Sequence, residues 1–250
     1  MKPRFVGRLS LADVVTVSNA AVGFLAAATA TFDVGLAARL ILLAAVADGL
    51  DGVLARRYGS SAAGEYLDSL ADVASFGVAP ALLVSVVVEQ AWTGVPMLVG
   101  AYALPAVFVS MAVVRLGLYT AYDSHAAETE GVPSTLAATV VAAATLAGVI
   151  GPALVVAVTA ILAVLMTLTI TYPDLHAQDA LVMGAVQVLA IALPGWYGEG
   201  FAFALLFLSL AYLFLGPWFY WRRTSTGDSG PGTEPGAGRD ADADRDADGA

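Results

Sequence analysis

The chain alternates between long apolar runs and short polar breaks. A helix that spans a bilayer needs about 20 mostly apolar residues. Runs of this kind predict eight membrane helices, at approximately residues 13–32, 35–56, 66–89, 95–119, 132–150, 152–171, 180–195 and 200–221. Only Gly151 and Pro152 separate the fifth run from the sixth, and the seventh is short. The pattern therefore predicts about eight spans, within a range of six to eight.

The composition agrees with a membrane protein. Hydrophobic residues make up 59% of the 250 residues, charged residues only 13%, and the mean hydropathy is +0.79. A soluble domain carries about 25% charged residues. We therefore expect an all-α, polytopic integral membrane protein. The chain has no cysteine, which excludes disulfides and thiolate metal sites.

The C-terminal residues differ from the rest of the chain. They are rich in Asp and contain no apolar run, so they cannot bury enough apolar surface to fold. We predict a membrane domain over residues 1–223 and a disordered acidic tail over residues 224–250. The tail, the net charge of −10 and the single lysine, Lys2, indicate a halophilic archaeon. A GC-rich genome with a tail of no function is the alternative.

The basic N-terminus and the first apolar run together resemble a cleaved signal peptide. However, Thr16, Ser18 and Asn19 lie in the middle of this run, and polar residues are unusual in a signal core. We therefore expect a retained first helix.

Basic residues predict the orientation, because cytoplasmic loops carry an excess of Lys and Arg. If the number of spans is even, most basic residues lie on the same side of the membrane: Lys2, Arg4, Arg8, Arg56, Arg57, Arg115, Arg222 and Arg223. Arg39 is the exception, at the outer start of the second span. We expect a multi-pass protein of the cell membrane with both termini in the cytoplasm.

Four aspartates lie where the second and third predicted helices meet. Residues three or four apart share a helix face. Asp48 and Asp51 therefore lie on one stripe, and Asp68 and Asp72 lie on another. The loop at 57–63 is short, which makes the two helices antiparallel neighbours. The four carboxylates can then converge at the cytoplasmic end of the pair.

Such a cluster needs compensating positive charge. A charged residue within a membrane helix costs about 2.5–3.5 kcal/mol on insertion scales, and Arg56 and Arg57 balance at most two carboxylates. Carboxylate oxygens suit hard cations such as Mg²⁺, Ca²⁺ or Mn²⁺, and two bridged ions are a familiar arrangement for phosphoryl transfer. Gly52, Ala55 and Gly64 lie on the same stripes and leave room for a phosphate-bearing ligand. Carboxylates that only pair with arginines and cap helices are the alternative.

These residues resemble the signature of the CDP-alcohol phosphatidyltransferases. That family carries D-x-x-D-G-x-x-A-R, then seven or eight residues, then G-x-x-x-D-x-x-x-D. This chain has DGLDGVLAR from Asp48 to Arg56, seven residues, and GEYLDSLAD from Gly64 to Asp72. Every fixed position matches. The resemblance implies that an alcohol attacks the β-phosphate of a CDP-linked lipid and that CMP is released.

The resemblance also implies a role for each matching position. Asp48, Asp51 and Asp68 would hold one Mg²⁺ or Mn²⁺ ion, and Asp48, Asp68 and Asp72 would hold a second. Asp72 would also be the general base that takes the proton of the alcohol. The residues expected to bind the CDP-linked lipid are Asn19, Gly52, Ala55, Arg56, Ser61 and Gly64.

Further residues resemble the phosphatidylserine and archaetidylserine synthase branch of the family. DSLADVASFGVAP, at residues 68–80, matches the pattern D-S-x-x-D-x-x-S-F-G-x-x-P. TVSNAAVG at 16–23 and EGVPS at 130–134 also look like this branch. The resemblance, over roughly residues 10–140, implies L-serine as the acceptor and a homodimer. The lipid would be CDP-archaeol in an archaeon and CDP-diacylglycerol otherwise.

One segment departs from the branch. Its usual R-L-x-R-F-N is replaced by RLGLYT, from Arg115 to Thr120, so the second arginine and the asparagine are absent. Binding of serine would then fall to Arg115, and we add Ser69 and Ser75 as candidate acceptor-binding residues. An interfacial arginine whose side chain snorkels to the membrane surface is the alternative for Arg115.

Other functions remain as alternatives. Inositol phosphate or glycerol phosphate as acceptor would need more cations than Arg56, Arg57 and Arg115 provide. An ion or proton transporter would need polar residues at mid-membrane in several helices, whereas these aspartates gather at one end of two helices. We expect membrane lipids but no nucleic acid as partners, and exposed loop positions for His125 and His176.

Overall fold

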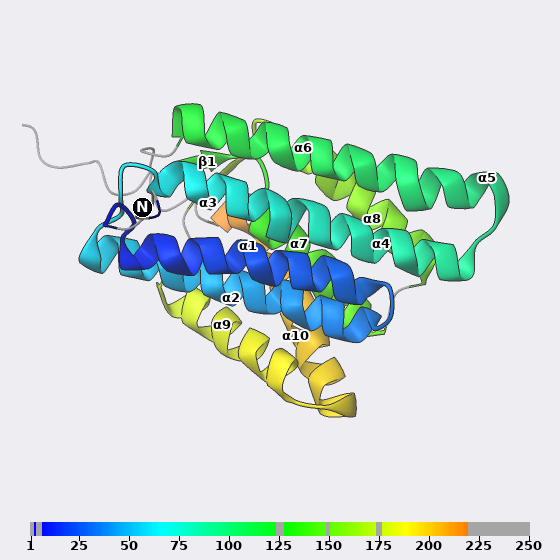
Figure 1. Cartoon of the computed structure of the whole chain (residues 1–250). Coiled ribbons are helices and arrows are strands. Elements are labelled where there is room, and N and C mark those ends of the chain that lie inside the picture. Colours follow the sequence, from blue (N-terminus) through cyan, green and yellow to red (C-terminus); the bar gives the residue numbers. More distant parts are fainter. Residues whose placement is uncertain (1–2, 4–6, 124–127, 149–150, 174–176, 220–250) are drawn as a thin grey trace, which may run out of the picture.

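The computed structural model describes residues 3, 7–123, 128–148, 151–173 and 177–219. These residues form eight continuous helical segments, and successive segments run in opposite directions through one bundle (Figure 1). The prediction of an all-α protein is confirmed. The predicted tail at 224–250 and both histidines, His125 and His176, lie outside the described residues.

The first two helices form an antiparallel hairpin, α1 (Leu11–Ala30) and α2 (Val34–Tyr58). A capping box starts α1: the Ser10 hydroxyl accepts from the backbone N–H of Asp13, and the Asp13 carboxylate accepts from the N–H of Ser10. Caps of this kind satisfy the N–H groups that a helix start leaves without a partner. The start of α1 is therefore held in place at the end of the bundle where the aspartates lie.

The third helical segment is continuous but changes its winding. It consists of α3 (Gly64–Asp72), the π-helical segment η1 (Val73–Val78) and α4 (Ala79–Ala91). A π-turn inside an α-helix is rare and often lies at a functional site. Here the wider turns begin directly after Asp72. The fourth segment consists of α5 (Gly94–Met97), η2 (Leu98–Ala103), α6 (Leu104–Leu118) and η3 (Tyr119–Asp123).

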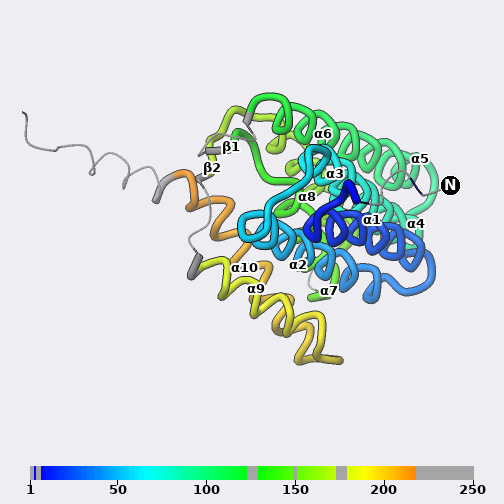
Figure 2. Tube along the Cα trace, turned by 60° about the vertical axis from the view of Figure 1, so that its left-hand side comes forward, coloured from blue at the N-terminus to red at the C-terminus, as the bar shows by residue number. Residues whose placement is uncertain are grey.

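The centre of the bundle is α7 (Ser134–Leu146). Nearly all of its side chains are buried, and it contacts α2, α4, α6, α8, η1 and α10. The remaining helices are α8 (Pro152–Leu165), α9 (Ala177–Ala192) and α10 (Gly195–Phe219). The helix α9 packs on α2 and α10 at one side of the bundle (Figure 2). The start of α7 thus lies inside the bundle, among the helices that carry the aspartates and Arg115.

Two short strands, which the sequence pattern did not predict, join the loops before α7 and after α8. They are β1 (Glu128–Glu130) and β2 (Thr171–Pro173), paired antiparallel. The hydroxyl of Tyr172 donates to the carbonyl of Leu213 at 3.2 Å, which ties the ribbon to α10. The helix α8 ends at Leu165 and a turn leads to the strand, so α8 is shorter than the predicted helix at 152–171.

The apolar helices make this an integral membrane protein. Four described segments are long and apolar enough to cross a bilayer: Leu11–Ala30, Gly64–Ala91, Gly94–Tyr122 and Gly195–Pro217. Three shorter apolar helices accompany them, at Ser134–Leu146, Pro152–Leu165 and Asp179–Ala192. The end of α2, the start of α3 and the β-ribbon lie at the same end of the bundle (Figure 1).

Candidate active site

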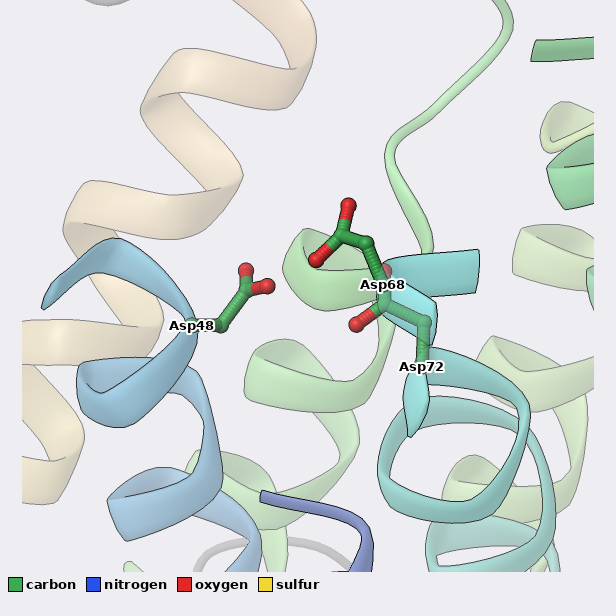
Figure 3. A group of neighbouring side chains, drawn as sticks. All are labelled: Asp48, Asp68 and Asp72. Carbon is green, nitrogen blue, oxygen red and sulfur yellow. The ribbon is translucent and has the colours of Figure 1, made fainter. Parts of the chain in front are cut away.

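Three aspartates point toward one another between α2 and α3 (Figure 3). One carboxylate oxygen from each of Asp48, Asp68 and Asp72 lies within 4.8 Å of the others. Asp68 and Asp72 are four residues apart and so share one face of α3. The short connection from α2 places that face opposite Asp48. We call these three residues the aspartate cluster.

The aspartate cluster is poorly compensated. Asp72 is only 6% exposed, and its Oδ1 has no hydrogen-bond partner among the described residues. The guanidinium of Arg115, on α6, is close enough to offset part of the Asp72 charge. Asp48 and Asp68 are half-buried, and carboxylates that lie this close together away from bulk water need further positive charge. The oxygen donors and the unpartnered Oδ1 fit a hard cation such as Mg²⁺ or Mn²⁺.

Asp51, the fourth predicted ligand, is placed differently. It lies on the same stripe of α2 as Asp48 but is not part of the aspartate cluster. Asp51 is 5% exposed, and its Oδ2 accepts a hydrogen bond of 2.7 Å from the hydroxyl of Thr16 on α1. The structure therefore brings Asp51 against α1, at the rim of the aspartate cluster.

A cavity of about 600 Å³ lies beside the aspartates. This volume lies in the range of sites that bind small molecules and cofactors, about 300–1,000 Å³. Its walls are the starts of α1 and α3, the end of α2 and the loop between α2 and α3. The predicted site residues that line it are Asp48, Asp51, Gly52, Ala55, Arg56, Ser61, Gly64 and Asp68. A ligand in the cavity would therefore lie directly beside two members of the aspartate cluster.

The loop between α2 and α3 closes tightly onto α1. A Cβ on Gly64 would lie 2.9 Å from Oδ1 of Asp13 and 2.9 Å from Cβ of Ser60. Asp13 is almost fully buried and accepts hydrogen bonds from the side chain and backbone of Ser61. Glycine at position 64 thus permits the close contact that forms one wall of the cavity.

Asn19 and Ser75 meet where α1 packs against η1. The hydroxyl of Ser75, which is fully buried, donates to the backbone carbonyl of Asn19 at 2.9 Å. A Cβ on Gly23 would lie 2.6–2.8 Å from atoms of Ser75. Neither Asn19 nor Ser75 lines the cavity. Their roles in binding lipid and acceptor stay predictions, and the structure gives them a packing contact.

Arg115 and Ser69 lie on the α6 side of the aspartates. Arg115 is 8% exposed, its Nη1 lies 3.4 Å from the hydroxyl of Ser134, and its guanidinium lies 5.3 Å from the ring of Tyr119. This inward position does not fit a side chain that snorkels to the membrane surface. Ser69 hydrogen-bonds to Thr120, which occupies the place of the branch's asparagine.

The sequence comparisons agree with this geometry. Residues 9–222 match the family model for CDP-alcohol phosphatidyltransferase. The chain belongs to that family. This confirms the predicted resemblance, and the chain is a CDP-alcohol phosphatidyltransferase.

Three relatives of this CDP-alcohol phosphatidyltransferase carry names that specify serine. An archaetidylserine synthase of Methanothermobacter thermautotrophicus is 30% identical over 177 residues, which is 69% of this chain and 73% of that protein. A CDP-diacylglycerol–serine O-phosphatidyltransferase of Methanocaldococcus jannaschii is 43% identical over 76 residues, 30% of this chain and 35% of that protein. One of the same name from Mycobacterium leprae is 58% identical over 45 residues, 18% of this chain and 15% of that protein.

Three polar residues outside the signature at Asp48–Asp72 take part in the site, and the sequence pattern assigned no contact in the site to any of them. They are Asp13, Thr16 and Thr135. The capping box SLAD at the start of the first apolar run is a sequence signal for Asp13. No local pattern connects Thr16 to Asp51 or Thr135 to Asp48, because the partners lie on different helices.

Proposed function

We propose that this CDP-alcohol phosphatidyltransferase transfers the phosphatidyl-type group of a CDP-linked lipid to the hydroxyl of L-serine and releases CMP. The observation that carries the proposal is the aspartate cluster beside a cavity of about 600 Å³. The names of the three relatives support serine as the acceptor.

Each residue of the site would have a separate role in the reaction. The serine hydroxyl oxygen forms a bond to the β-phosphorus of the CDP-linked lipid, and the bond from that phosphorus to the CMP oxygen breaks. Asp72 takes the hydroxyl proton, since a carboxylate oxygen without a partner is free to accept it. Two Mg²⁺ or Mn²⁺ ions, held by Asp48, Asp51, Asp68 and Asp72, would supply positive charge to the phosphates.

The two substrates would bind on different sides of the aspartates. The cavity residues Gly52, Ala55, Arg56, Ser61 and Gly64 would hold the CDP part, with the small side chains leaving room for the nucleotide. On the other side, Arg115 would bind the carboxylate of serine. It is buried, near Asp72 and supported by Ser134, and a buried guanidinium binds carboxylates strongly. Ser69 would assist it.

The setting in the membrane is part of the proposal. Eight helices would cross the bilayer, with the site and both termini on the cytoplasmic side, as the arginine pattern predicts. CDP-archaeol would be the lipid, in keeping with the archaetidylserine synthase of Methanothermobacter thermautotrophicus. CDP-diacylglycerol is the alternative lipid, and a homodimer remains the expected assembly.

The test is CMP release by the purified full-length chain with CDP-archaeol or CDP-diacylglycerol and Mn²⁺ or Mg²⁺. Serine, inositol phosphate and glycerol phosphate are compared as acceptors. We expect CMP release that depends on serine, and none from an Asp48→Asn, Asp68→Asn double variant. Release with a phosphorylated acceptor alone would overturn the serine assignment. No release with any acceptor would overturn the proposed reaction.

A further inference from the structure

Two threonine hydroxyls approach the aspartates of α2 from different helices. Thr16, on α1, lies 2.7 Å from Oδ2 of Asp51, and Thr135, on α7, lies 3.3 Å from Oδ2 of Asp48. Neither threonine belongs to the signature that runs from Asp48 to Asp72. We propose that Thr16 and Thr135 are positioning residues, which hold the two α2 carboxylates in the orientation that binds divalent cations. This inference rests on the metal-dependent reaction proposed above.

The hydroxyl proton of Thr16 has two possible acceptors. Its Oγ1 lies 2.7 Å from Oδ2 of Asp51 and 3.1 Å from the backbone carbonyl of Ala12. A carboxylate is the stronger acceptor. If the proton pointed to Ala12 instead, two oxygens would face each other at 2.7 Å without a hydrogen between them. The contact with Asp51 is therefore a hydrogen bond donated by Thr16.

Burial makes this hydrogen bond decisive for the position of Asp51. Thr16 is 6% exposed and Asp51 is 5% exposed, so each offers only a small part of its surface to water, and both line the cavity. If a buried carboxylate loses its hydrogen-bond donor, its unsatisfied charge destabilises the folded protein, and the side chain turns toward another partner. Thr16 thus determines which oxygen of Asp51 remains directed at the cavity that Asp51 lines.

Thr135 approaches α2 from another helix, α7. It lies in the first turn of α7, the most buried helix of the bundle, which gives its hydroxyl a fixed position. The preceding residue, Ser134, contacts Arg115, the proposed ligand of the serine carboxylate. The first turn of α7 therefore positions one metal ligand, Asp48, and one acceptor-binding residue together.

The experiment measures Mn²⁺ binding by the purified full-length chain in detergent, without nucleotide or acceptor, from the electron paramagnetic resonance signal of free Mn²⁺. Removal of a hydrogen bond to a metal ligand typically weakens metal affinity by about 10–100-fold. We expect a loss of this size in Thr16→Val and in Thr135→Val. The conservative variants Thr16→Ser and Thr135→Ser keep the hydroxyl and should bind Mn²⁺ as the unmodified chain does.

A matched control is Thr139→Val, one turn further along α7. Thr139 is 5% exposed and does not line the cavity, so this change should leave Mn²⁺ affinity unaltered. Where a valine variant does not fold, the Ala and Ser variants at the same position make the same comparison. Equal Mn²⁺ affinity with and without the hydroxyl, or an equal loss in Ser and Val, would overturn the positioning role. An unmodified chain that binds no Mn²⁺ would overturn the metal centre itself.

Discussion

Asp72 combines features that the other three aspartates do not share. It is the most deeply placed member of the aspartate cluster, and one of its oxygens has no partner among the described residues. Arg115, on α6, lies near it. An alcohol is a weak nucleophile until a carboxylate removes its proton during attack. These features favour Asp72 as the proton acceptor.

Replacing this carboxylate by an amide tests the assignment. Asp72→Asn keeps the shape of the side chain but cannot take a proton, so serine-dependent CMP release should fall by roughly 10²–10⁴-fold. Size-exclusion chromatography should show a folded protein. Glu89→Gln, an exposed change at the end of α4, serves as the control and should retain activity. An Asp72→Asn enzyme with normal turnover would remove Asp72 from the role of base.

The sequence could predict the aspartate cluster because its information is local. Helical spacing places Asp48 on one stripe and Asp68 and Asp72 on another, and a short loop brings the stripes together. The contact of Thr16 with Asp51 could not be predicted in this way. It depends on how α1 packs against α2, and helical periodicity identifies a face without identifying the helix that covers it.

At the scale of the elements, the contact between α1 and η1 determines how closely α1 packs against the helical segment that carries Asp68 and Asp72. The wider turns of η1 begin after Asp72, and the Ser75 hydroxyl bonds to the backbone of α1. Gly23 allows this approach because it has no side chain. The apolar pattern at 66–89 predicts a helix correctly but does not distinguish a π-turn from α-helix, since both bury similar residues.

Gly23→Ala tests the packing of α1 on η1. The added methyl would lie 2.6–2.8 Å from Ser75, and overpacking of this kind costs about 1–3 kcal/mol. We expect a lower thermal unfolding temperature in detergent, followed by tryptophan fluorescence.

The control for this change is Gly184→Ala on α9, where a Cβ would meet no atom within 4 Å. It should keep or raise the unfolding temperature, because Ala favours a helix over Gly by about 1 kcal/mol. A Gly23→Ala protein as stable as the Gly184→Ala protein would show that the contact with Ser75 adapts without cost.

At the scale of the whole molecule, the bundle separates a polar end from an apolar body. The end of α2, the start of α3 and the β-ribbon lie at one end, and the tight turns between α1 and α2 and between α4 and α5 lie at the other (Figure 1). The aspartate cluster is formed by the end of α2 and by α3, which also line the cavity. Apolar length predicted the helices, and arginine placement predicts which end faces the cytoplasm. The β-ribbon could not be predicted, because it pairs two short loop segments that are distant in the sequence.

The orientation can be tested directly, because the chain has no cysteine. Ala62→Cys and Thr93→Cys each introduce one thiol, at exposed positions in the turns at opposite ends of the bundle. With the site in the cytoplasm, a membrane-impermeant maleimide should label the Thr93→Cys protein in intact cells. It should label the Ala62→Cys protein only after the membrane is opened. The reverse pattern would place the aspartates outside the cell and would contradict the proposed orientation. Labelling of both positions from one side would mean that the segment Gly64–Ala91 does not cross the bilayer, against the prediction from its length and apolar character.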